Sequence, residues 1–582
     1  MFNKYYQDEL TYLRQLGQEF AAAYPQVGHM LSEVGTDPDV ERLLEGFAFL
    51  TGRIRERLDS ELPELTHAFV GLLWPHYLRP VPSMTIMEFE AAMTMQDVQI
   101  IPRGTEIESK PVEGTRCRFR TTSDVRLYPF RISETQLDVP RSRPAVLKVQ
   151  FAVSEKANVA DLKLQDLHLH IHGEAAIAYE LYLLLSRHVR AVTYRCGDRS
   201  IRLDGQENCR PAGFEAAEAL LPYPVDAFPG YRLLQEFFAL PEKFLSVKLP
   251  DISPLVKLGV TGAFEIEFEF DRHPSDRLRV KSGVLRTGCT PAVNLMSIRS
   301  APIRVEHDKT EYRVRADAPN PQHYEIFSVD RVIGWMKGTV KEREYPPFFS
   351  YRHGLTGKWA STEYHQLRLR PAVVGAGTET YVSFVAAAEQ GVVPSTETVA
   401  ADLTCSNRNL CEKLRPGDVS VATSQSPTFA SFKNIGRVTA SVPPPLEGRL
   451  LWQLISHLSL NYLSLAKVET LRAMIALYDF HGHVDRQAAR ATELRLAGIK
   501  AVRAKPSDLV RQGSVYRGVS LEIDLQEDAF VAEGEMLLFG AVLNTFLSLY
   551  ASMNCFTRLK VKGTQQGGMY EWPPILGQQE LL

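Results

Sequence analysis

Residues 5–24 read YYQDELTYLRQLGQEFAAAY, and apolar side chains recur along this stretch at alternating intervals of four and three residues. This spacing is typical of a helix that lies along another helix, because it places one apolar stripe on one face. We therefore predict a first helix here that ends at Pro25, since proline cannot continue a helix. The stripe consists of Tyr6, Leu10, Leu13, Gly17, Phe20 and Tyr24.

Two more helices are expected before residue 80. Asp37 followed by Pro38 is a typical helix start, because the aspartate side chain can cap the helix and proline suits its first position. This second helix should end by Pro63, and a third should run from Leu65 to Trp74. The second helix repeats the spacing of the first with Val40, Leu43, Phe47, Leu50 and Ile54.

The two stripes can be buried in either of two ways. They can pack inside their own domain, or they can be offered to another chain, and spacing alone leaves both alternatives open. The pattern is typical of assembly rather than of catalysis, so we take the stripe residues of both helices as the candidate partner interface.

Length and composition narrow the class of protein. The 582 residues correspond to about four domains at roughly 150 residues each. Lys and Arg number 66 against 69 Asp and Glu, so the chain lacks the basic excess that holds nucleic acid. The seven cysteines are odd in number and scattered, which is typical of reduced thiols in the cytoplasm. The opening MFNKYYQDEL has no apolar core, so we expect no secretion signal.

One apolar stretch has the length of a membrane span. Met536 to Thr557 carries no charge, and about 20 residues cross a bilayer. It contains Asn544 and other polar residues, whose side chains would lack partners in lipid. We therefore expect a buried helix of a soluble domain and no membrane insertion.

Hydrophobic periodicity predicts an α+β multidomain fold. Alternating apolar and polar residues indicate strands through the middle of the chain, whereas both helical and alternating patterns follow the prolines at 443–445. Strands are expected at 147–153, 167–171, 264–270, 519–525 and 559–561, with a hairpin turn at 196–199. Helices are expected at 174–189, 231–240, 449–480, 486–497 and 536–553. The predicted domains are an N-terminal helical module at 1–80, strand-rich middle domains at 81–285 and 286–442, and an α+β C-terminal domain at 443–582.

Two groups of histidines could bind a metal ion. His168, His170 and His172 lie on one face of a predicted strand, but three collinear ligands fit a zinc tetrahedron poorly, so we expect a solvated strand face. His481 and His483 resemble the start of the HxHxDH run of metallo-β-lactamase-fold hydrolases, but Arg486 stands where the next histidine is required, and we expect a loop at the end of a helix.

Other chemical signals are weaker. Glu265, Glu267 and Glu269 share one strand face and are expected to form an exposed polar edge, which discourages unwanted strand pairing. Phosphate-loop, dinucleotide and nucleophile-elbow motifs are absent from the sequence. We therefore expect no catalytic residue, no cofactor and no metal ion.

The sequence resembles one family along its whole length: TssF, also called VasA or ImpG, a baseplate subunit of the bacterial type VI secretion system. Many short matches occur in the same order, which makes the resemblance specific. They are YYQDELTYLRQLGQEF (5–20), DPDVERLLEGFAFLTGRIRERLDSELPEL (37–65), YLRPVPSM (77–84), RFRTTSDV (118–125), LLPYPVDAFPGYRLLQEFFALPEKF (220–244), PAVNL (291–295), SNRNL (406–410), LLWQLISHLSLNYLSL (450–465), FGAVLNTFLSLYASMNCFT (539–557) and EWPP (571–574). The chain departs from the family pattern at Thr287-Gly288 and at Met296. It also departs at Cys411, a position where the family usually has a proline.

The resemblance implies a structural, non-enzymatic role. TssF proteins resemble the wedge proteins of contractile phage tails and form wedges with TssG and TssK, around the VgrG spike and with TssE linking to the sheath. The resemblance also implies further TssF copies in each wedge, a helical bundle shared between chains, and wing-like β-rich domains beginning with 81–285. It implies a cytoplasmic location, at a baseplate docked on the inner-membrane complex. Two alternatives remain: a metal-dependent hydrolase or effector using His481 and His483, and a polysaccharide-binding β protein.

Overall fold

The structure is a computed structural model that describes residues 6–7, 9–13, 16, 38–59, 63–92, 94–223, 230–260, 262–306, 309–336, 342–348, 363–372, 377–386, 397–446, 448–456, 467–511, 514–548, 551, 555–565 and 567–577. The chain divides into two compact units. The smaller unit comprises Met1–Trp74 and Pro445–Leu458, and the larger comprises Pro75–Pro444 and Ser459–Leu582. The predicted division into four domains stays a prediction.

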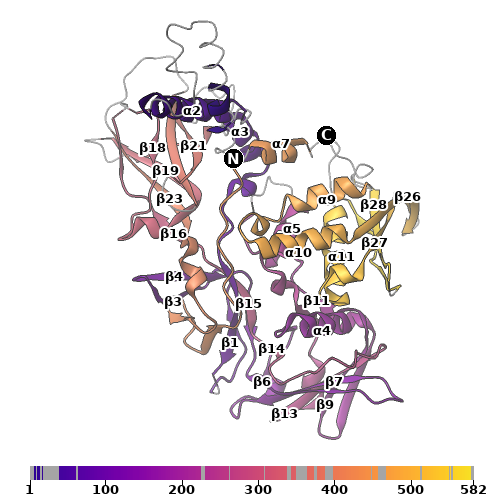
Figure 1. Cartoon of the computed structure of the whole chain (residues 1–582). Coiled ribbons are helices and arrows are strands. Elements are labelled where there is room, and N and C mark those ends of the chain that lie inside the picture. Colours follow the sequence, from indigo (N-terminus) through magenta and orange to yellow (C-terminus); the bar gives the residue numbers. More distant parts are fainter. Residues whose placement is uncertain are drawn as a thin grey trace, which may run out of the picture. The chain divides into compact units, whose positions relative to one another are not determined.

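The smaller unit is helical in its described parts. It contains α2 (Pro38–Asp59), α3 (Pro63–Leu73) and α7 (Gly448–Ser456), and α3 packs against α7 (Figure 1). The second and third predicted helices are therefore confirmed, with the break before Pro63. Of the first predicted helix, residues 6–7, 9–13 and 16 are helical, whereas Gly17, Phe20 and Tyr24 lie outside the described residues.

The larger unit begins with a six-stranded sheet in the order β24-β3-β4-β15-β1-β25. Its strands are β1 (Met84–Ala91), β3 (Glu106–Val112), β4 (Thr115–Thr121), β15 (Cys289–Val293), β24 (Val419–Ala422) and β25 (Ala430–Asn434). β1 pairs with β15 on one side and with β25 on the other, so this sheet joins segments far apart in the sequence. Just before β1, Val81 forms an isolated antiparallel bridge with Val442.

Two further sheets share the region up to residue 286. One has the order β10-β9-β13-β7-β6 and the other the order β11-β12-β8-β14. The first comprises β6 (Phe130–Asp138), β7 (Val146–Val153), β9 (Val189–Cys196), β10 (Arg199–Asp204) and β13 (Ala263–Phe270), and the second β8 (Leu167–Ile171), β11 (Arg210–Pro211), β12 (Ser246–Leu249) and β14 (Leu285–Arg286). Helices α4 (Ala175–Arg187) and α6 (Pro254–Leu258) belong to the same region. The strands predicted here and the turn between β9 and β10 are confirmed.

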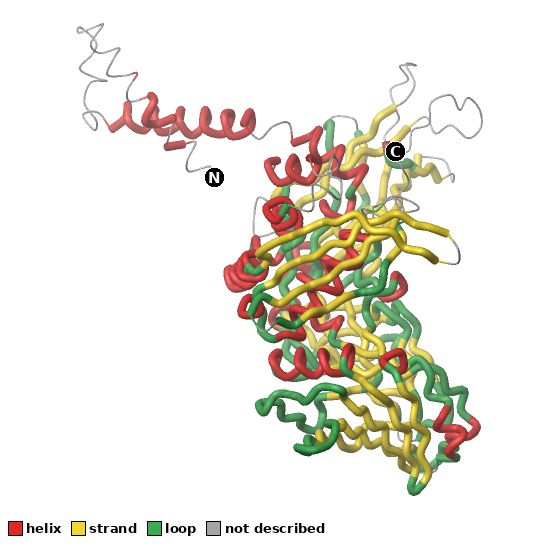
Figure 2. Tube along the Cα trace, turned by 90° about the vertical axis from the view of Figure 1, so that its right-hand side faces the viewer, coloured by secondary structure: helices red, strands yellow, loops and turns green. Residues whose placement is uncertain are grey.

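Residues 296–406 form two facing sheets. One contains β16 (Met296–Arg299), β17 (Ile303–Val305), β19 (Glu325–Met336), β20 (Glu342–Glu344) and β23 (Glu397–Ser406), and the other contains β18 (Tyr312–Arg313), β21 (Glu363–Pro371) and β22 (Thr378–Ala386). Val332, Val382 and Leu403 from the two sheets belong to one buried apolar cluster. A separate pair of short strands is formed by β2 (Gln99–Ile101) and β5 (Val125–Leu127). Strands therefore dominate the middle of the chain as predicted. The strands of the whole structure are drawn in yellow in Figure 2.

The C-terminal part combines a sheet with helices. The sheet contains β26 (Ile499–Arg511), β27 (Ser514–Leu525), β28 (Cys555–Gly563), β29 (Met569–Glu571) and β30 (Ile575–Leu576), and its helices are α9 (Val468–Ala476), α10 (Arg486–Ala497) and α11 (Glu533–Ser548). β27 and β28 run parallel, and α11 supplies the crossover that parallel neighbours need. α5 (Gly230–Ala239) and α4 both pack against α11. The predicted mixed α+β class is confirmed.

The long uncharged stretch of the sequence is a buried core helix. Met536, Phe539 and Phe546 of α11 are fully buried, and Asn544 is nearly so. α11 ends at Ser548, so it is shorter than predicted. Within the part of the chain that the structure describes, no helix has both the length and the apolar character that crossing a membrane requires.

Candidate assembly surface

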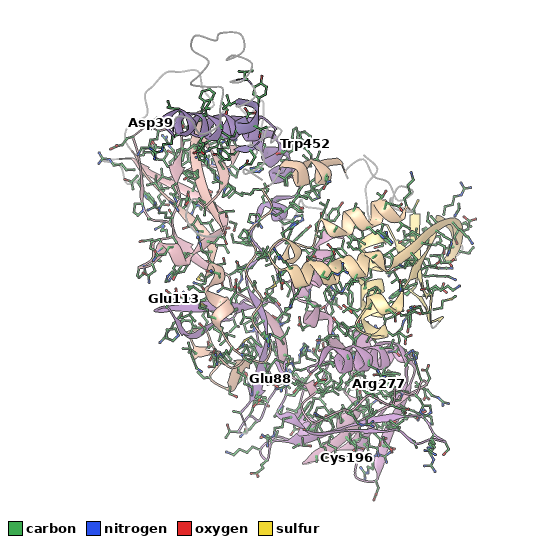
Figure 3. All side chains as sticks on the ribbon, in the orientation of Figure 1. Asp39, Glu88, Glu113, Cys196, Arg277 and Trp452 are labelled. Atoms are coloured by element: carbon green, nitrogen blue, oxygen red, sulfur yellow. The ribbon has the colours of Figure 1, made fainter. Side chains whose placement is uncertain are left out.

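α2 exposes apolar residues from the stripe that the sequence places on it. Leu43, Phe47 and Leu50 are 73, 56 and 60 % exposed, and they share one helix face because they lie at positions i, i+4 and i+7. Ala48, on another side of the same helix, is fully buried. Asp39 marks the start of this helix in Figure 3. Several large exposed apolar side chains on one face typically mark an interaction site.

α3 is apolar on two sides. Val70 and Trp74 are buried, whereas Phe69 and Leu72 are 51 and 55 % exposed. The exposed pair was not among the predicted interface residues, although the spacing of Leu65, Phe69 and Leu72 repeats the intervals of four and three that identify the other stripes. A helix that leaves large apolar side chains exposed has surface left for a partner. We call Leu43, Phe47, Leu50, Phe69 and Leu72 the exposed helical face.

The other predicted interface residues behave differently. Leu10 is buried, and Tyr6 and Leu13 are half-buried, so the described part of the first stripe lies against its own chain. The side chains of Val40 and Ile54 lie outside the described residues, as do Gly17, Phe20 and Tyr24. That the full set forms an interface stays a prediction.

The histidine row at β8 is only partly the solvated face that we expected. β8 lies between β12 and β14 in its sheet, and His168 and His172 are half-buried whereas His170 is buried. His170 is buried, its Nδ1 lies 3.0 Å from Ser246 Oγ, and burial lowers its pKa to about 3. His168 Nε2 contacts Asp166 at 3.1 Å. Among the described residues, no group of three His, Cys, Asp or Glu side chains lies close enough to hold a metal ion.

The glutamate row of β13 is not an exposed edge. β13 is the central strand of its sheet, between β9 and β7. Glu267 pairs with Arg195 of β9 at 3.1 Å, and Glu269 pairs with Arg202 of β10 at 2.6 Å. The Arg202 side chain lowers the pKa of Glu269 by hydrogen bonding. These carboxylates therefore form cross-strand ion pairs with arginines of β9 and β10.

His481 and His483 lie in a turn, as predicted. Residues His481–His483 form a short 3₁₀ helix between α9 and α10. Burial lowers the pKa of His481. The Asp485 side chain, the acidic residue of the supposed metal motif, instead caps α10 by accepting a hydrogen bond from Gln487 N at 2.8 Å. The acidic residue therefore has a structural role.

Two of the sequence motifs meet at a joint between sheets. Asn294 Nδ2 of PAVNL donates to Asn407 Oδ1 of SNRNL at 2.8 Å, and Asn407 N donates back to Asn294 Oδ1 at 2.6 Å. Asn294 Nδ2 also donates to Arg118 O of β4 at 2.7 Å. The short helix η9 (Arg408–Lys413) follows at once, and Lys413 pairs with Glu113 of the β3–β4 turn, labelled in Figure 3. We call η9 with Asn294 and Asn407 the sheet joint.

The larger unit also contains a polar cavity of about 780 Å³ beside β1, β5, β6 and β8. Its walls include Glu88, paired with Arg286 at 2.6 Å, and Asp166, paired with Lys248 at 2.9 Å. Small-molecule sites are typically lined by apolar side chains with few polar groups. The paired charges of this cavity therefore favour a solvated seam between strands.

Known proteins resemble this chain along its whole length. Residues 1–579 match the family described as type VI secretion system, TssF. Type VI secretion system component TssF1 of Pseudomonas aeruginosa is 31 % identical, with 98 % of this chain and 97 % of that protein covered. A chain of the TssK-TssF-TssG baseplate subcomplex, solved by cryo-electron microscopy, superposes with a TM-score of 0.77 at 31 % identity, covering 92 % of this chain and 98 % of that one. A chain of the baseplate complex from the type VI secretion system gives 0.68 at 26 % identity, with 99 % of both chains covered. This chain therefore belongs to the TssF family of the type VI secretion system.

Proposed function

We propose that this chain is a non-enzymatic structural subunit of a type VI secretion baseplate wedge and that its exposed helical face binds a partner chain. The observation that carries the proposal is the exposure of Leu43, Phe47 and Leu50 on one side of α2. TssG and TssK are the partners that we expect, because a solved relative of similar length is a chain of a TssK-TssF-TssG subcomplex.

The physical basis is the hydrophobic effect. Full burial of a large apolar side chain contributes about 1.5–3 kcal/mol, and these side chains have more than half of their surface left to bury. Leu43, Phe47 and Leu50 lie together on one side of α2, and a few central side chains typically carry most of the binding energy of an interface. The polar residues around these apolar side chains then orient the bound partner chain.

The finer assignments follow from the family resemblance. We propose that further TssF copies, TssE and the VgrG spike contact the same wedge, and that the wedge works in the cytoplasm at a baseplate docked on the inner-membrane complex. Its role is then mechanical, because large interfaces can hold neighbours in one arrangement until a signal favours another. The strand-rich middle of the chain supplies the surfaces that reach adjacent subunits.

The test is co-purification of the tagged full-length chain with coexpressed TssG and TssK. The double variant Phe47→Glu and Leu50→Glu should lose both partners, because it places two charges in the interface. Its circular dichroism and Tm should match those of the parent chain, since both positions are exposed. Arg53→Glu is the matched control, because it makes the same change in net charge at an exposed α2 position outside the exposed helical face.

Retention of TssG and TssK by the double variant would contradict the proposal. Loss of both partners by Arg53→Glu as well would show that net charge, not the apolar face, determines binding. Elemental analysis addresses the hydrolase alternative separately: one equivalent of zinc that is retained through dialysis and lost in His481→Ala would favour it.

A further inference from the structure

The hairpin of β26 and β27 extends beyond the other strands of its sheet. β26 and β27 stay paired out to Arg511 and Ser514, whereas β28 pairs with β27 no nearer to the end of the hairpin than Arg517. β26 is the last strand in the order of the sheet, so no described strand lies on its outer side (Figure 1). We call residues 505–511 and 514–517, at this end, the hairpin arm. A ribbon of two strands is only marginally stable in water, and a third strand stabilises it.

The outer edge of β26 carries backbone groups that can pair with a further strand. Pro506 stands opposite Val519 in the ladder, and proline has no N–H to donate to a neighbouring strand. Sheets accept proline where its backbone nitrogen points away from the neighbour. Backbone groups of successive residues point alternately toward the neighbouring strand and away from it. Asp508 and Val510, the next residues with the orientation of Pro506, therefore direct their N–H and C=O groups outward.

The end of the hairpin arm also carries exposed apolar side chains. Val510 and Val515 stand opposite each other and are 70 and 66 % exposed. Because side chains alternate between the two faces of a strand, Val515 lies in one row with Leu521 and Ile523, which are buried. The apolar row that the sheet buries near its base thus continues into the arm, where the described residues leave it exposed. A chain added beside the arm would cover this apolar surface.

The charge of the hairpin arm favours an acidic partner. The charged residues of this stretch are three bases and one acid, Lys505, Arg511, Arg517 and Asp508. Nearer the base of the hairpin, Arg503 is paired with Asp524 of β27 at 2.5 Å, so its charge is balanced within the sheet. The net positive charge of the arm attracts acidic side chains and repels a second copy of the same arm.

We propose that the hairpin arm binds an extended acidic segment of another protein, which adds to the outer edge of β26 as a further strand. Backbone hydrogen bonds to Asp508 and Val510 provide the pairing, as in other cases of strand addition. Because Pro506 cannot donate, the ladder with the added strand lies on the side of Pro506 toward the end of the hairpin. The proposal does not depend on the exposed helical face, since it uses different residues.

The experiment measures binding of a fluorescent peptide of four Val-Glu repeats to the full-length chain by fluorescence anisotropy. This acidic peptide should bind in low salt, and a peptide of four Val-Lys repeats should bind about tenfold more weakly or less, because its charge has the wrong sign. Added salt should weaken binding of the acidic peptide, since these charges are exposed to solvent. Neither measurement needs TssG or TssK, so the result is separate from that of the co-purification test.

Val510→Pro tests the backbone pairing directly. It removes the outward N–H of residue 510 and leaves the β26–β27 ladder intact, as Pro506 does, so affinity for the acidic peptide should fall about tenfold. Val510→Thr is the matched control, because threonine keeps the N–H and the branched shape and should keep most of the affinity. Lys505→Glu should also weaken binding, because it reverses one charge of the arm.

Hydrogen exchange in the parent chain gives a measurement that does not depend on the folding of any variant. The acidic peptide should slow exchange of amides in a peptide covering 500–511, and it should leave exchange in 533–548 unchanged. Unchanged exchange in 500–511, or equal binding of the acidic and basic peptides, would overturn the proposal. So would full affinity in Val510→Pro. Self-association of the parent chain that Val510→Pro abolishes would show that the arm binds a second copy, which also contradicts an acidic segment as its occupant.

Discussion

At the scale of single residues, Gly534 of α11 lies directly against the backbone of α4. A Cβ atom built on Gly534 would lie 1.8 Å from the carbonyl oxygen of Tyr179, a distance that no methyl group can occupy. The first turn of α11 therefore touches the backbone of α4 directly. Glycine is needed here because of this close approach and not because of an unusual backbone angle.

Gly534→Ala should destabilise the protein by about 3 kcal/mol or more, because overpacking against a backbone atom forces one helix to move. Gly46→Ala is the control: that position lies inside α2 with nothing within 4 Å of the added Cβ, and alanine should stabilise the helix by up to about 1 kcal/mol. Urea unfolding of the two variants measures the difference. Equal stabilities would contradict the close approach.

Buried histidines should make the protein sensitive to acid. Burial lowers the pKa of His76 and of His170 from 6.5 to about 3, so between these values the unfolded chain binds more protons than the folded one. Their contribution to the free energy of unfolding is complete above pH 6.5. It is lost as the pH falls below that value, at about 1.4 kcal/mol per pH unit for each histidine.

Replacement of one buried histidine should flatten this dependence. His170→Gln keeps a polar group near Ser246 and should lose less stability than the parent chain between pH 7 and pH 5, measured by urea unfolding. His273→Gln, at an exposed position, should follow the parent. If unfolding free energy changes with pH at the same slope in all three proteins, His170 is not held neutral by burial.

At the scale of elements, ion pairs of similar geometry differ greatly in burial. Glu236 and Lys243 near α5 are almost fully buried and lie 2.5 Å apart, and Arg232 also contacts Glu236, at 3.4 Å. The pair of Glu267 and Arg195 between β13 and β9 remains partly open to solvent. Removing one partner of a buried pair leaves an uncompensated charge, which is more costly than the loss of a solvated pair.

Glu236→Ala should therefore cost about 3–5 kcal/mol of unfolding free energy, because it strands the Lys243 charge. Glu267→Ala should cost less than about 1 kcal/mol, since water can solvate Arg195. Chemical denaturation of both variants at pH 7 checks the contrast. A larger loss of unfolding free energy in Glu267→Ala than in Glu236→Ala would show that the buried pair is not the more costly one to break.

The elements themselves could largely be predicted from local sequence pattern. The period of apolar residues and the positions of prolines identified α2, α3, α10, β7, β8 and β13, because each of these signals acts within one element. The neighbours of a strand could not be predicted this way. The glutamate row of β13 looks like a sheet edge in the sequence, and only the order of strands shows that β13 is a central strand.

The exposed apolar residues of the candidate surface could be predicted only in part, because spacing within one helix is visible in the sequence and packing between elements is not. Leu43, Phe47 and Leu50 share a face because of helix geometry alone, and the structure exposes them. The burial of Leu10 depends on packing that its own spacing does not encode. The exposed side of α3 could have been found, since Phe69 and Leu72 follow the same intervals as the other stripes.

At the scale of the whole molecule, the two compact units should respond differently to assembly. α11 is buried on nearly all sides within the larger unit, whereas α2 carries large exposed side chains. Amide hydrogen exchange distinguishes such regions, because protection follows local burial and stability.

Exchange of α2 and α3 amides should be fast in the isolated chain and should slow by at least tenfold when TssG and TssK are bound. Exchange of α11 should be slow in both states and should serve as the internal reference. Mass spectrometry of peptides from 38–59, 63–73 and 533–548 reads the three regions together. Unchanged exchange of α2 in a complete complex would place the partner elsewhere.

The position of β1 between β15 and β25 has a consequence for synthesis of the protein. β1 emerges early from the ribosome, but its flanking strands β15 and β25 emerge about 200 and 340 residues later. The strand has two open edges until β15 emerges and one until β25 emerges. Open edges invite wrong pairing, and bringing such distant segments together slows folding. A nascent chain halted before residue 430 would therefore hold an unfinished sheet, which is a natural substrate for a chaperone.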